Sequence, residues 1–200
     1  MKVEQFVMAY LVEQDKIRAM LPEGFESLRP VLRINAEIRD EENVYVEFNT
    51  PVSHDGKRGW INIANWKSED GLSFLREGKK VTVSAPFLFL VWQGTGLEGG
   101  CPAEKDNDGC FFLNAAEIFR PNEKINKNKE FCDCEFAWKF GGSDASGKSE
   151  GKTLPAFAEE AVQNYEKAGF TPENAAKIPC RQVLGAYIVR FERKTDTVSG

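Results

Sequence analysis

The sequence contains a single histidine, and this shortage excludes several kinds of catalytic site. His54 lies in PVSHDGKRG (residues 51–59), which the Asp55-Gly56 pair marks as a turn. A histidine-based catalytic triad would have to use this turn residue, and a zinc site would find neither further histidines nor a paired CxxC motif. We therefore expect neither kind of site, and the sequence predicts no metal or other cofactor.

Cysteine is also scarce, with five residues in a chain of 200. An odd number of this size does not suggest a disulfide framework and is more typical of thiols in a reducing compartment. Cys132 and Cys134 form a CxC pair, but both lie on the apolar face of FCDCEFAWKF (residues 131–140). We interpret them as small core residues in preference to metal ligands.

Long apolar runs and basic clusters are missing as well. The first 15 residues include Glu4, Gln5 and Glu13 where a signal peptide needs an apolar core, so we expect a cytoplasmic protein without a membrane partner. The formal net charge of -5 argues against a general nucleic-acid binder, because phosphate contacts need clustered Lys and Arg. The nearest basic run, NEKINKNKE (residues 122–130), is interrupted by glutamates and is interpreted as a solvated loop.

What the sequence does contain is alternation of apolar and polar residues, the pattern of half-buried strands. Turn clusters such as DEEN and EKDNDG separate the alternating segments. The expected strands span residues 5–12, 30–39, 44–52, 60–66, 81–92, 110–119, 131–140 and 183–191. The fold class predicted is α+β but mainly β, with the strands forming a curved or closed antiparallel sheet, since closure removes exposed edges.

Three helices are expected between these strands, at residues 13–20, at residues 68–77 and from Thr153 to Gly169. A short turn at residues 171–177 leads into the last strand. The length of the chain and its 42% hydrophobic content predict one domain, residues 1–194, followed by a flexible tail at residues 195–200.

Residues 142–149 match the phosphate-loop pattern GxxxxGK[ST]. In such a loop the helix begins within the motif, so that Lys148 and Ser149 would stand in its first turn. Pro155 is favoured only in the first turn of a helix, which places the start of the third helix near Thr153, several residues too late. We therefore interpret the motif as a flexible linker in preference to a nucleotide site.

The N-terminal third of the chain resembles the acetoacetate decarboxylase family. The resemblance is carried by AYLVEQDKIRAMLPEGFESLRPVLRINAEI at residues 9–38 and by VYVEFNTPVSHDGKRGWINIANW at residues 44–66. It implies a cone-like, closed or nearly closed antiparallel β-barrel with a few peripheral helices. It also implies that a buried lysine forms a Schiff base with a β-keto acid, whose protonated imine accepts the electrons released when carbon dioxide leaves.

Within this resemblance, Tyr45-Val46-Glu47 is similar to the Tyr-x-Glu of the family's active-site strand. Asn35 stands where the family carries a second glutamate, and Glu37 lies on the same face two residues on. The family's Pro-Lys-Lys segment is not present in that form. The nearest substitute is FLREGKKVTV, whose Lys79 and Lys80 are either a catalytic pair or two solvated lysines.

Alternation also predicts a polar face independently of the resemblance. The face is formed by Arg33, Asn35 and Glu37 on one strand and by Tyr45, Glu47 and Asn49 on the next. It lines a cavity or forms a wet outer surface, and the pattern leaves both open. Trp60, Trp66 and Trp92 fit either the wall of such a cavity or an ordinary core.

In the cavity alternative Glu47 is largely buried. Its expected partners are Arg33, Asn35 or one of the two lysines at 79 and 80. Val44, Val46 and Phe48 then pack between the barrel wall and its covering helices.

These observations lead to two functional hypotheses. The first is an acetoacetate decarboxylase-like enzyme, a carboxy-lyase acting on a small keto acid or related carbonyl compound. Its catalytic residues would be Glu47, Lys80 and Lys79, and its substrate-binding residues Arg33, Asn35, Glu37 and Tyr45. The second is a non-catalytic protein that binds a small organic acid or carbonyl ligand on the same barrel. A homo-oligomer is expected from the family resemblance and from the long apolar stretch at residues 85–92.

Overall fold

The computed structural model describes residues 1–99, 110–113, 116–119, 129–142, 144–149, 162–163 and 165–193. Within this part of the chain the backbone forms one sheet of 13 strands. Their bounds are β1 Lys2–Leu11, β2 Glu26–Ser27, β3 Val31–Arg39, β4 Asn43–His54, β5 Lys57–Lys67, β6 Ser73–Glu77, β7 Lys80–Ala85, β8 Leu88–Gly99, β9 Cys110–Leu113, β10 Ala116–Phe119, β11 Lys129–Trp138, β12 Ser146–Ser149 and β13 Gln182–Glu192.

The sheet runs in the order β10-β9-β5-β4-β3-β1-β13-β11-β8-β7-β6, with β12 paired to β11 and β2 paired to β4. Neighbouring strands are antiparallel. The exception is the parallel pair β5 and β9, so the sheet is mixed and not purely antiparallel. The prediction of a mainly β chain is confirmed, and six of the eight expected strands form near the predicted positions. The other two were each predicted as one strand and are wrong in that respect, because residues 81–92 divide into β7 and β8 and residues 110–119 include the antiparallel pair β9 and β10.

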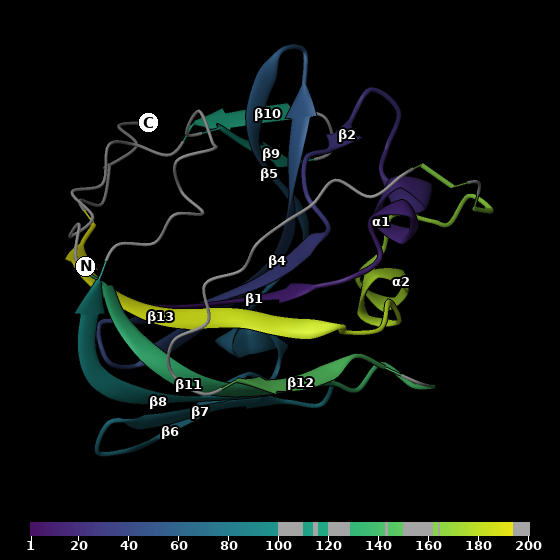
Figure 1. Cartoon of the computed structure of the whole chain (residues 1–200). Coiled ribbons are helices and arrows are strands. Elements are labelled where there is room, and N and C mark those ends of the chain that lie inside the picture. The colour runs from purple at the N-terminus through teal and green to yellow at the C-terminus, as the bar shows by residue number, and fades with distance from the viewer. Residues whose placement is uncertain are drawn as a thin grey trace.

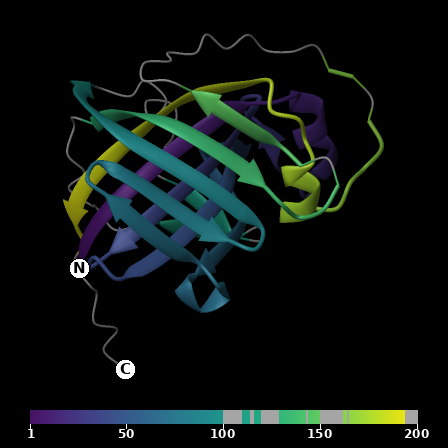
Figure 2. The same ribbon diagram turned by 90° about the horizontal axis from the view of Figure 1, so that it is seen from below.

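The sheet curls strongly and forms a half-barrel, in which β8, β7 and β6 turn back beneath β1 and β13 (Figures 1 and 2). Two ring contacts show how far the curl reaches. Phe48 on β4 lies 4.5 Å, centroid to centroid, from Trp138 on β11, although three strands separate β4 from β11 in the sheet order. Phe6 on β1 lies 4.8 Å from Trp92 on β8 in the same way. One face of the sheet therefore closes on itself to form the core.

Alternation accounts for the composition of that core. On β1 the residues Phe6, Met8 and Tyr10 point into it and are fully buried. Cys132 and Cys134 belong to the same cluster, which confirms the interpretation of the CxC pair as core residues. Burial raises the pKa of both thiols, so they remain protonated and serve packing instead of metal binding or nucleophilic attack.

Two short α-helices lie together at one end of the half-barrel (Figure 1). Helix α1, Gln14–Met20, confirms the prediction for residues 13–20. Helix α2, Pro172–Ala176, occupies the segment expected to be a turn, and the hydroxyl of Thr171 accepts a hydrogen bond from the backbone N–H of Asn174 at its start. No helix in the described part of the chain is both long and apolar enough to cross a membrane.

The helix predicted at residues 68–77 is wrong. A 3-10 turn, Ser68–Asp70, ends at Gly71, which adopts a left-handed conformation (φ 84°), and the remaining residues form strand β6. The hairpin with β7 provides β6 with backbone partners along its whole length, and this pairing overrides the helical tendency of the segment. The third predicted helix falls mostly on residues outside the described ranges, and residues 165–169 are not helical.

The phosphate-loop pattern ends in a strand and not in a helix. Lys148 and Ser149 lie in β12, opposite Glu135 and Cys134 of β11. A Cβ atom on Gly147 would lie 2.7 Å from Cγ2 of Val183, so this glycine permits the close approach of β12 to β13. The expectation that the motif does not open into a helix is confirmed at these residues, but its interpretation as a flexible linker is wrong for Ser146–Ser149, which pair with β11.

Two further expectations fall near the ends of strands. The turn at Asp55-Gly56 is confirmed, and the His54 ring just before it stacks on Phe25 with 4.2 Å between centroids.

Residues 122–128 of the basic run lie outside the described ranges. Lys129, however, begins β11 and is only 3% exposed, so the interpretation as a solvated loop is wrong for this lysine.

We expect the contact of Phe48 across the curl to dominate core stability. Phe48→Ala should lower the free energy of unfolding by about 3–5 kcal/mol, because a buried ring is replaced by a cavity. Leu75→Ala on the exposed side of β6, where the side chain is 59% exposed, should change it by no more than about 0.5 kcal/mol. Urea unfolding followed by tryptophan fluorescence measures both, and equal losses in the two variants would contradict this account of the core.

Candidate functional site

The face of β3 and β4 that turns away from the core is polar and buried. In the register of these strands Arg33 lies opposite Asn49, Asn35 opposite Glu47, and Glu37 opposite Tyr45. The exposed fraction is 0% for Glu37 and 6% for Glu47, and only Tyr45 is half-buried. Of the two alternatives left by the sequence, a wet outer surface is thus excluded for these side chains. We call this group the polar face.

Glu47 is held by neighbours on the polar face. The hydroxyl of Tyr45 donates a hydrogen bond to Glu47 Oε1 at 2.8 Å, and Nδ2 of Asn35 donates to Oε2 at 3.2 Å. The predicted burial of Glu47 and its predicted partner Asn35 are both found. Oδ1 of Asn35 is buried and accepts no hydrogen bond from the described residues, which makes it an acceptor for a ligand N–H or O–H.

Arg33 takes a different position from the one expected as the partner of Glu47. Its Nε donates to Oδ1 of Asn49 at 2.7 Å, and its guanidinium carbon lies 3.6 Å from the centre of the Trp60 ring. Stacking on an indole suits the planar guanidinium and keeps its charge on the buried face. Of the three tryptophans considered, Trp60 therefore flanks the polar face, whereas Trp66 and Trp92 pack against core aromatics.

Glu37 forms the most extensively bonded group of the polar face. Arg193, just after β13, donates to both carboxylate oxygens at 3.0 and 2.9 Å, Arg39 donates to Oε2 at 2.8 Å, and Gln5 donates to Oε1 at 3.1 Å. Burial raises the pKa of the Glu37 carboxyl, but the hydrogen bonds and charges of Arg193 and Arg39 outweigh it, so the net pKa is lower than usual. Glu37 is thus an ionised anchor that links β3 to the end of β13.

Lys129 is a buried cation on the same side of the sheet. Its Nζ lies 4.2 Å from the centre of the Tyr187 ring. Tyr187 pairs with Val7, and Val7 pairs with Asn35, so these cross-strand neighbours share the polar face. Sequence reasoning missed Lys129 because it stands among solvated residue types, although alternation with the core residue Cys132 would have placed it on the face opposite the core.

Lys79 and Lys80 lie elsewhere. Lys79 follows Gly78 in the tight turn between β6 and β7, Lys80 is the first residue of β7, and both are exposed. The Lys80 Nζ lies 4.0 Å from a Glu77 carboxylate oxygen, and Lys79 Nζ lies near Gly96 of β8. The structure brings Arg33, Asn35, Glu37, Tyr45 and Glu47 together and brings neither of these lysines into contact with Glu47.

The remaining expectation about β4 concerns its apolar residues, Val44, Val46 and Phe48. They were expected between the barrel wall and its covering helices, but Phe48 contacts Trp138 of the same sheet instead. The reason is the curl, which makes a distant part of the sheet the neighbour of β4.

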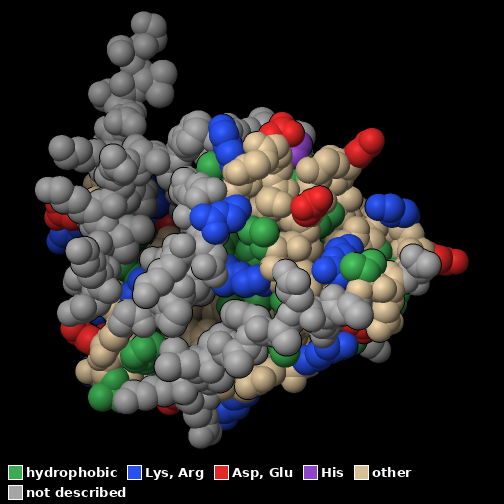
Figure 3. Space-filling view, turned by 45° about the horizontal axis from the view of Figure 1, so that its top comes forward, with side chains coloured by type: hydrophobic (Ala, Val, Ile, Leu, Met, Phe, Trp, Pro, Cys, Tyr) green, Lys and Arg blue, Asp and Glu red, His purple; other side chains and the backbone are tan. Residues whose placement is uncertain are grey.

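Positive side chains are visible at the surface of the molecule. In Figure 3 several Lys and Arg gather near the middle of the face shown, beside apolar side chains.

The bonds to Glu37 predict a specific acid sensitivity. Because the pKa of folded Glu37 is below its ordinary value of about 4.3, the group stabilises the fold fully above that value and loses this effect as pH falls through the folded pKa. Glu37→Gln should lower the free energy of unfolding at pH 7 by roughly 3–5 kcal/mol, because Arg193 loses its partner. It should also flatten the acid limb of a plot of stability against pH. Urea titrations between pH 3 and pH 7 test this, with the exposed Glu192→Gln as the control, and an unchanged acid limb would contradict it.

Comparisons with known proteins give a likeness of fold. No protein-family model matches the sequence, and no curated protein matches it. Among solved structures, an acetoacetate decarboxylase from Legionella pneumophila has a TM-score of 0.52 and 13% identity over 95% of this chain and 82% of its own. A second acetoacetate decarboxylase has a TM-score of 0.50 and 13% identity over 94% and 84%. An acetoacetate decarboxylase-like enzyme from Sphingomonas wittichii has a TM-score of 0.49 and 9% identity over 95% and 87%. The chain has the fold of acetoacetate decarboxylase, as the resemblance in its N-terminal third predicted.

Proposed function

We propose that the chain binds a small keto acid or a related carbonyl compound on the polar face and acts on it through a lysine Schiff base. The observation that carries the proposal is the buried Glu47 carboxylate, held between Tyr45 and Asn35. An ionised carboxylate in such a place stabilises a cation that forms beside it, and a protonated imine is such a cation. The fold shared with acetoacetate decarboxylase supports the same chemistry.

The polar face offers complementary groups for the substrate. Arg33 supplies a fixed positive charge for a substrate carboxylate, and Asn35 Oδ1 supplies an acceptor for a hydroxyl that forms during the reaction. Glu37 is already saturated by Arg193, Arg39 and Gln5, so its role is to keep these strands in place and not to exchange protons. Tyr45, half-buried, orients Glu47 and lies where a substrate would contact it.

Lys129 is our candidate for the reacting amine. A lysine must be neutral and desolvated to attack a carbonyl carbon, and Lys129 is buried on the polar side of the sheet, whereas Lys79 and Lys80 are exposed. Attack forms a C–N bond and a carbinolamine, which loses water to give the protonated imine. Loss of carbon dioxide from a β-keto acid then sends the C–C bond electrons into the imine, and protonation followed by hydrolysis returns the lysine.

Borohydride trapping identifies the amine. The protein is incubated with acetoacetate or pyruvate, reduced, digested and examined by peptide mass spectrometry. We expect the adduct on Lys129, its loss in Lys129→Met, and its persistence in the double variant Lys79→Met, Lys80→Met. An adduct on Lys79 or Lys80 would move the chemistry to the lysine pair considered in the sequence analysis, and no adduct on any lysine would remove the Schiff-base mechanism. Thermal melting of each variant verifies folding.

Glu47→Gln tests the carboxylate itself. Glutamine keeps the size and hydrogen-bonding capacity of glutamate, so the melting temperature should change little. Release of carbon dioxide from acetoacetate should fall about 100-fold or more, in line with the loss of one charged catalytic group. Glu135→Gln, on the exposed side of β11, is the matched control and should retain full activity. Unchanged turnover in Glu47→Gln would place the chemistry away from the polar face.

The second candidate function is binding without turnover. The observation that favours it is the exposure of Lys79 and Lys80, the lysines nearest to the family's pattern. Calorimetric titration with acetoacetate and pyruvate separates the two functions when it is run beside the carbon dioxide assay. Binding that Glu47→Gln weakens, with no carbon dioxide released by the unaltered protein, would favour a binding protein.

Self-association is a further part of the proposal. Leu88, Leu90 and Trp92 of the apolar stretch at residues 85–92 are buried in the core, but Phe89 and Val91 on the other side of β8 are only half-buried. We expect a homo-oligomer that covers this side of β8. Light scattering at micromolar concentration measures the mass, and Phe89→Lys should convert an oligomer to monomers; a monomer before substitution would contradict the proposal.

A further inference from the structure

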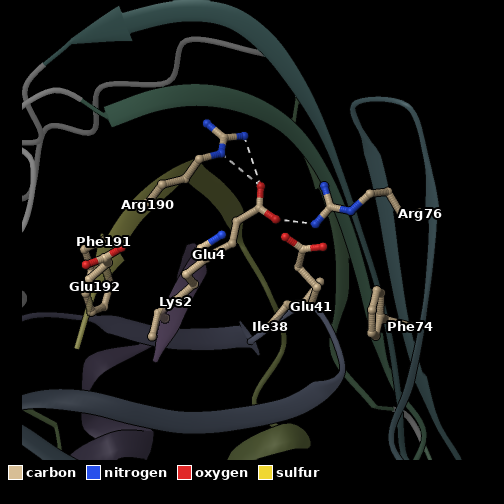
Figure 4. Close-up of a pocket in the computed structure, with 10 residues that line it drawn as sticks. Lys2, Glu4, Ile38, Glu41, Phe74, Arg76, Arg190, Phe191 and Glu192 are labelled. Carbon is tan, nitrogen blue, oxygen red and sulfur yellow. Dashed lines mark hydrogen bonds and ion pairs between the residues drawn. The ribbon is translucent and has the colours of Figure 1, made fainter. Parts of the chain in front are cut away.

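A cleft of about 750 Å³ opens at the mouth of the half-barrel, away from the polar face (Figure 4). Glu4 of β1 lines it and lies on the core face of the sheet, two residues before Phe6. Its other side is formed by Phe74 and Arg76 of the edge strand β6. None of the six residues of the polar face lines the cleft, so the cleft and the polar face share no residue.

Charged groups converge at the centre of the cleft. The Glu4 carboxylate lies between two arginines: Arg190 of β13 donates to Oε1 at 3.1 Å, and a terminal nitrogen of Arg76 donates to Oε2 (Figure 4). Arg190 also donates to Glu130 at 2.8 Å. Arg76, by contrast, uses one nitrogen, and its other N–H groups have no hydrogen-bond partner among the described residues. Arg76 can therefore bind an incoming carboxylate while it keeps Glu4.

Glu41 provides the opposite charge on the other side of the same space. It stands in the turn between β3 and β4 with a φ of 63°, a left-handed conformation that is uncommon outside glycine. Its side chain lines the cleft, its carboxylate is turned toward the Arg76 guanidinium in Figure 4, and it forms no ion pair with any described residue. A cationic group that enters the cleft thus meets an available carboxylate.

The balance of charge and the apolar walls restrict the ligand. Three cations line the cleft, Lys2, Arg76 and Arg190, and three anions, Glu4, Glu41 and Glu192, so the lining has no net charge. A ligand with one charge satisfies only half of this arrangement, whereas a zwitterion matches both Arg76 and Glu41. Beneath these groups, Ile38 and Phe74 offer an apolar surface for the rest of the ligand.

We propose that this cleft binds an α-amino acid with an apolar side chain. The carboxylate is held by Arg76, the ammonium group by Glu41, and the side chain rests against Phe74 and Ile38. This site is independent of the polar face and of any reaction there. It gives the half-barrel a second ligand site that shares no lining residue with the polar face.

Three probes that share a phenyl group test the charge requirement. Titration calorimetry compares L-phenylalanine with 3-phenylpropionate, which lacks the ammonium group, and with 2-phenylethylamine, which lacks the carboxylate. We expect measurable binding of L-phenylalanine and binding at least about tenfold weaker for each single-charge probe, because one charge-assisted contact is lost. Equal binding of L-phenylalanine and 3-phenylpropionate would overturn the assignment of Glu41, and no binding of L-phenylalanine would overturn the proposal.

Variants locate the site. Glu41→Gln leaves the ion pair between Arg76 and Glu4 intact, and Arg76→Gln removes the carboxylate contact, so both should weaken L-phenylalanine binding at least about tenfold. Glu42→Gln, the exposed neighbour in the turn, is the matched control and should bind normally. Glu47→Gln should also bind normally, and its failure to bind would move the ligand to the polar face and overturn the proposal. Unchanged binding of L-phenylalanine in Glu41→Gln would also overturn the proposal.

Discussion

The structure depends on the fact that β3 and β4 are buried on both faces. Side chains alternate across a strand, so the fixed register of this pair sends Ile34, Val46 and Phe48 to one side and Asn35 and Glu47 to the other. A slip by one residue would exchange the two sets and place carboxylates in the aromatic core. The aromatic contacts across the curl therefore hold the register that assembles the polar face, and folding and site formation are one event.

The two carboxylates of the polar face play different physical parts. Glu37 is surrounded by two arginines and an amide, which fixes its charge and links three strands across the sheet. Glu47 accepts hydrogen bonds from the Tyr45 hydroxyl and the Asn35 amide. The guanidinium groups around Glu37 offset its charge and tie neighbouring strands together, whereas the proposed chemistry is assigned to Glu47.

Much of this fold could be predicted from the sequence, because alternation is a local signal that burial on one face reinforces. It located most of the strands and the core cysteines, and it put Glu47 on the polar side of β4. The burial of that side was one of two alternatives that alternation left open. The segment at 68–77 could not be predicted in this way, since its strand depends on pairing with β7, and composition alone favours a helix there. Likewise the contact of Phe48 with Trp138 depends on how far the sheet curls, and no local pattern specifies that.

Lys129 shows the same limit at the site. Its neighbours in the sequence are solvated residue types, and only the pairing of β11 with β13 turns it toward Tyr187. Residues whose role is set by strands distant in the sequence cannot be recognised from their own segment. The carboxylate of Glu47 could be recognised because its two partners, Tyr45 and Asn35, lie on its own strand and on the strand next to it.

The ion pair between Arg76 and Glu4 has one more consequence. Strand β6 lies five places from β1 in the sheet order, so this pair joins the edge of the sheet to its middle without any backbone hydrogen bond. This link is a side-chain ion pair and not strand pairing. Backbone hydrogen bonds between strands break only when the strands separate, whereas a side-chain ion pair can break and re-form while every strand keeps its register. Because the two side chains are partly exposed, higher ionic strength weakens their attraction without breaking any backbone hydrogen bond of the sheet.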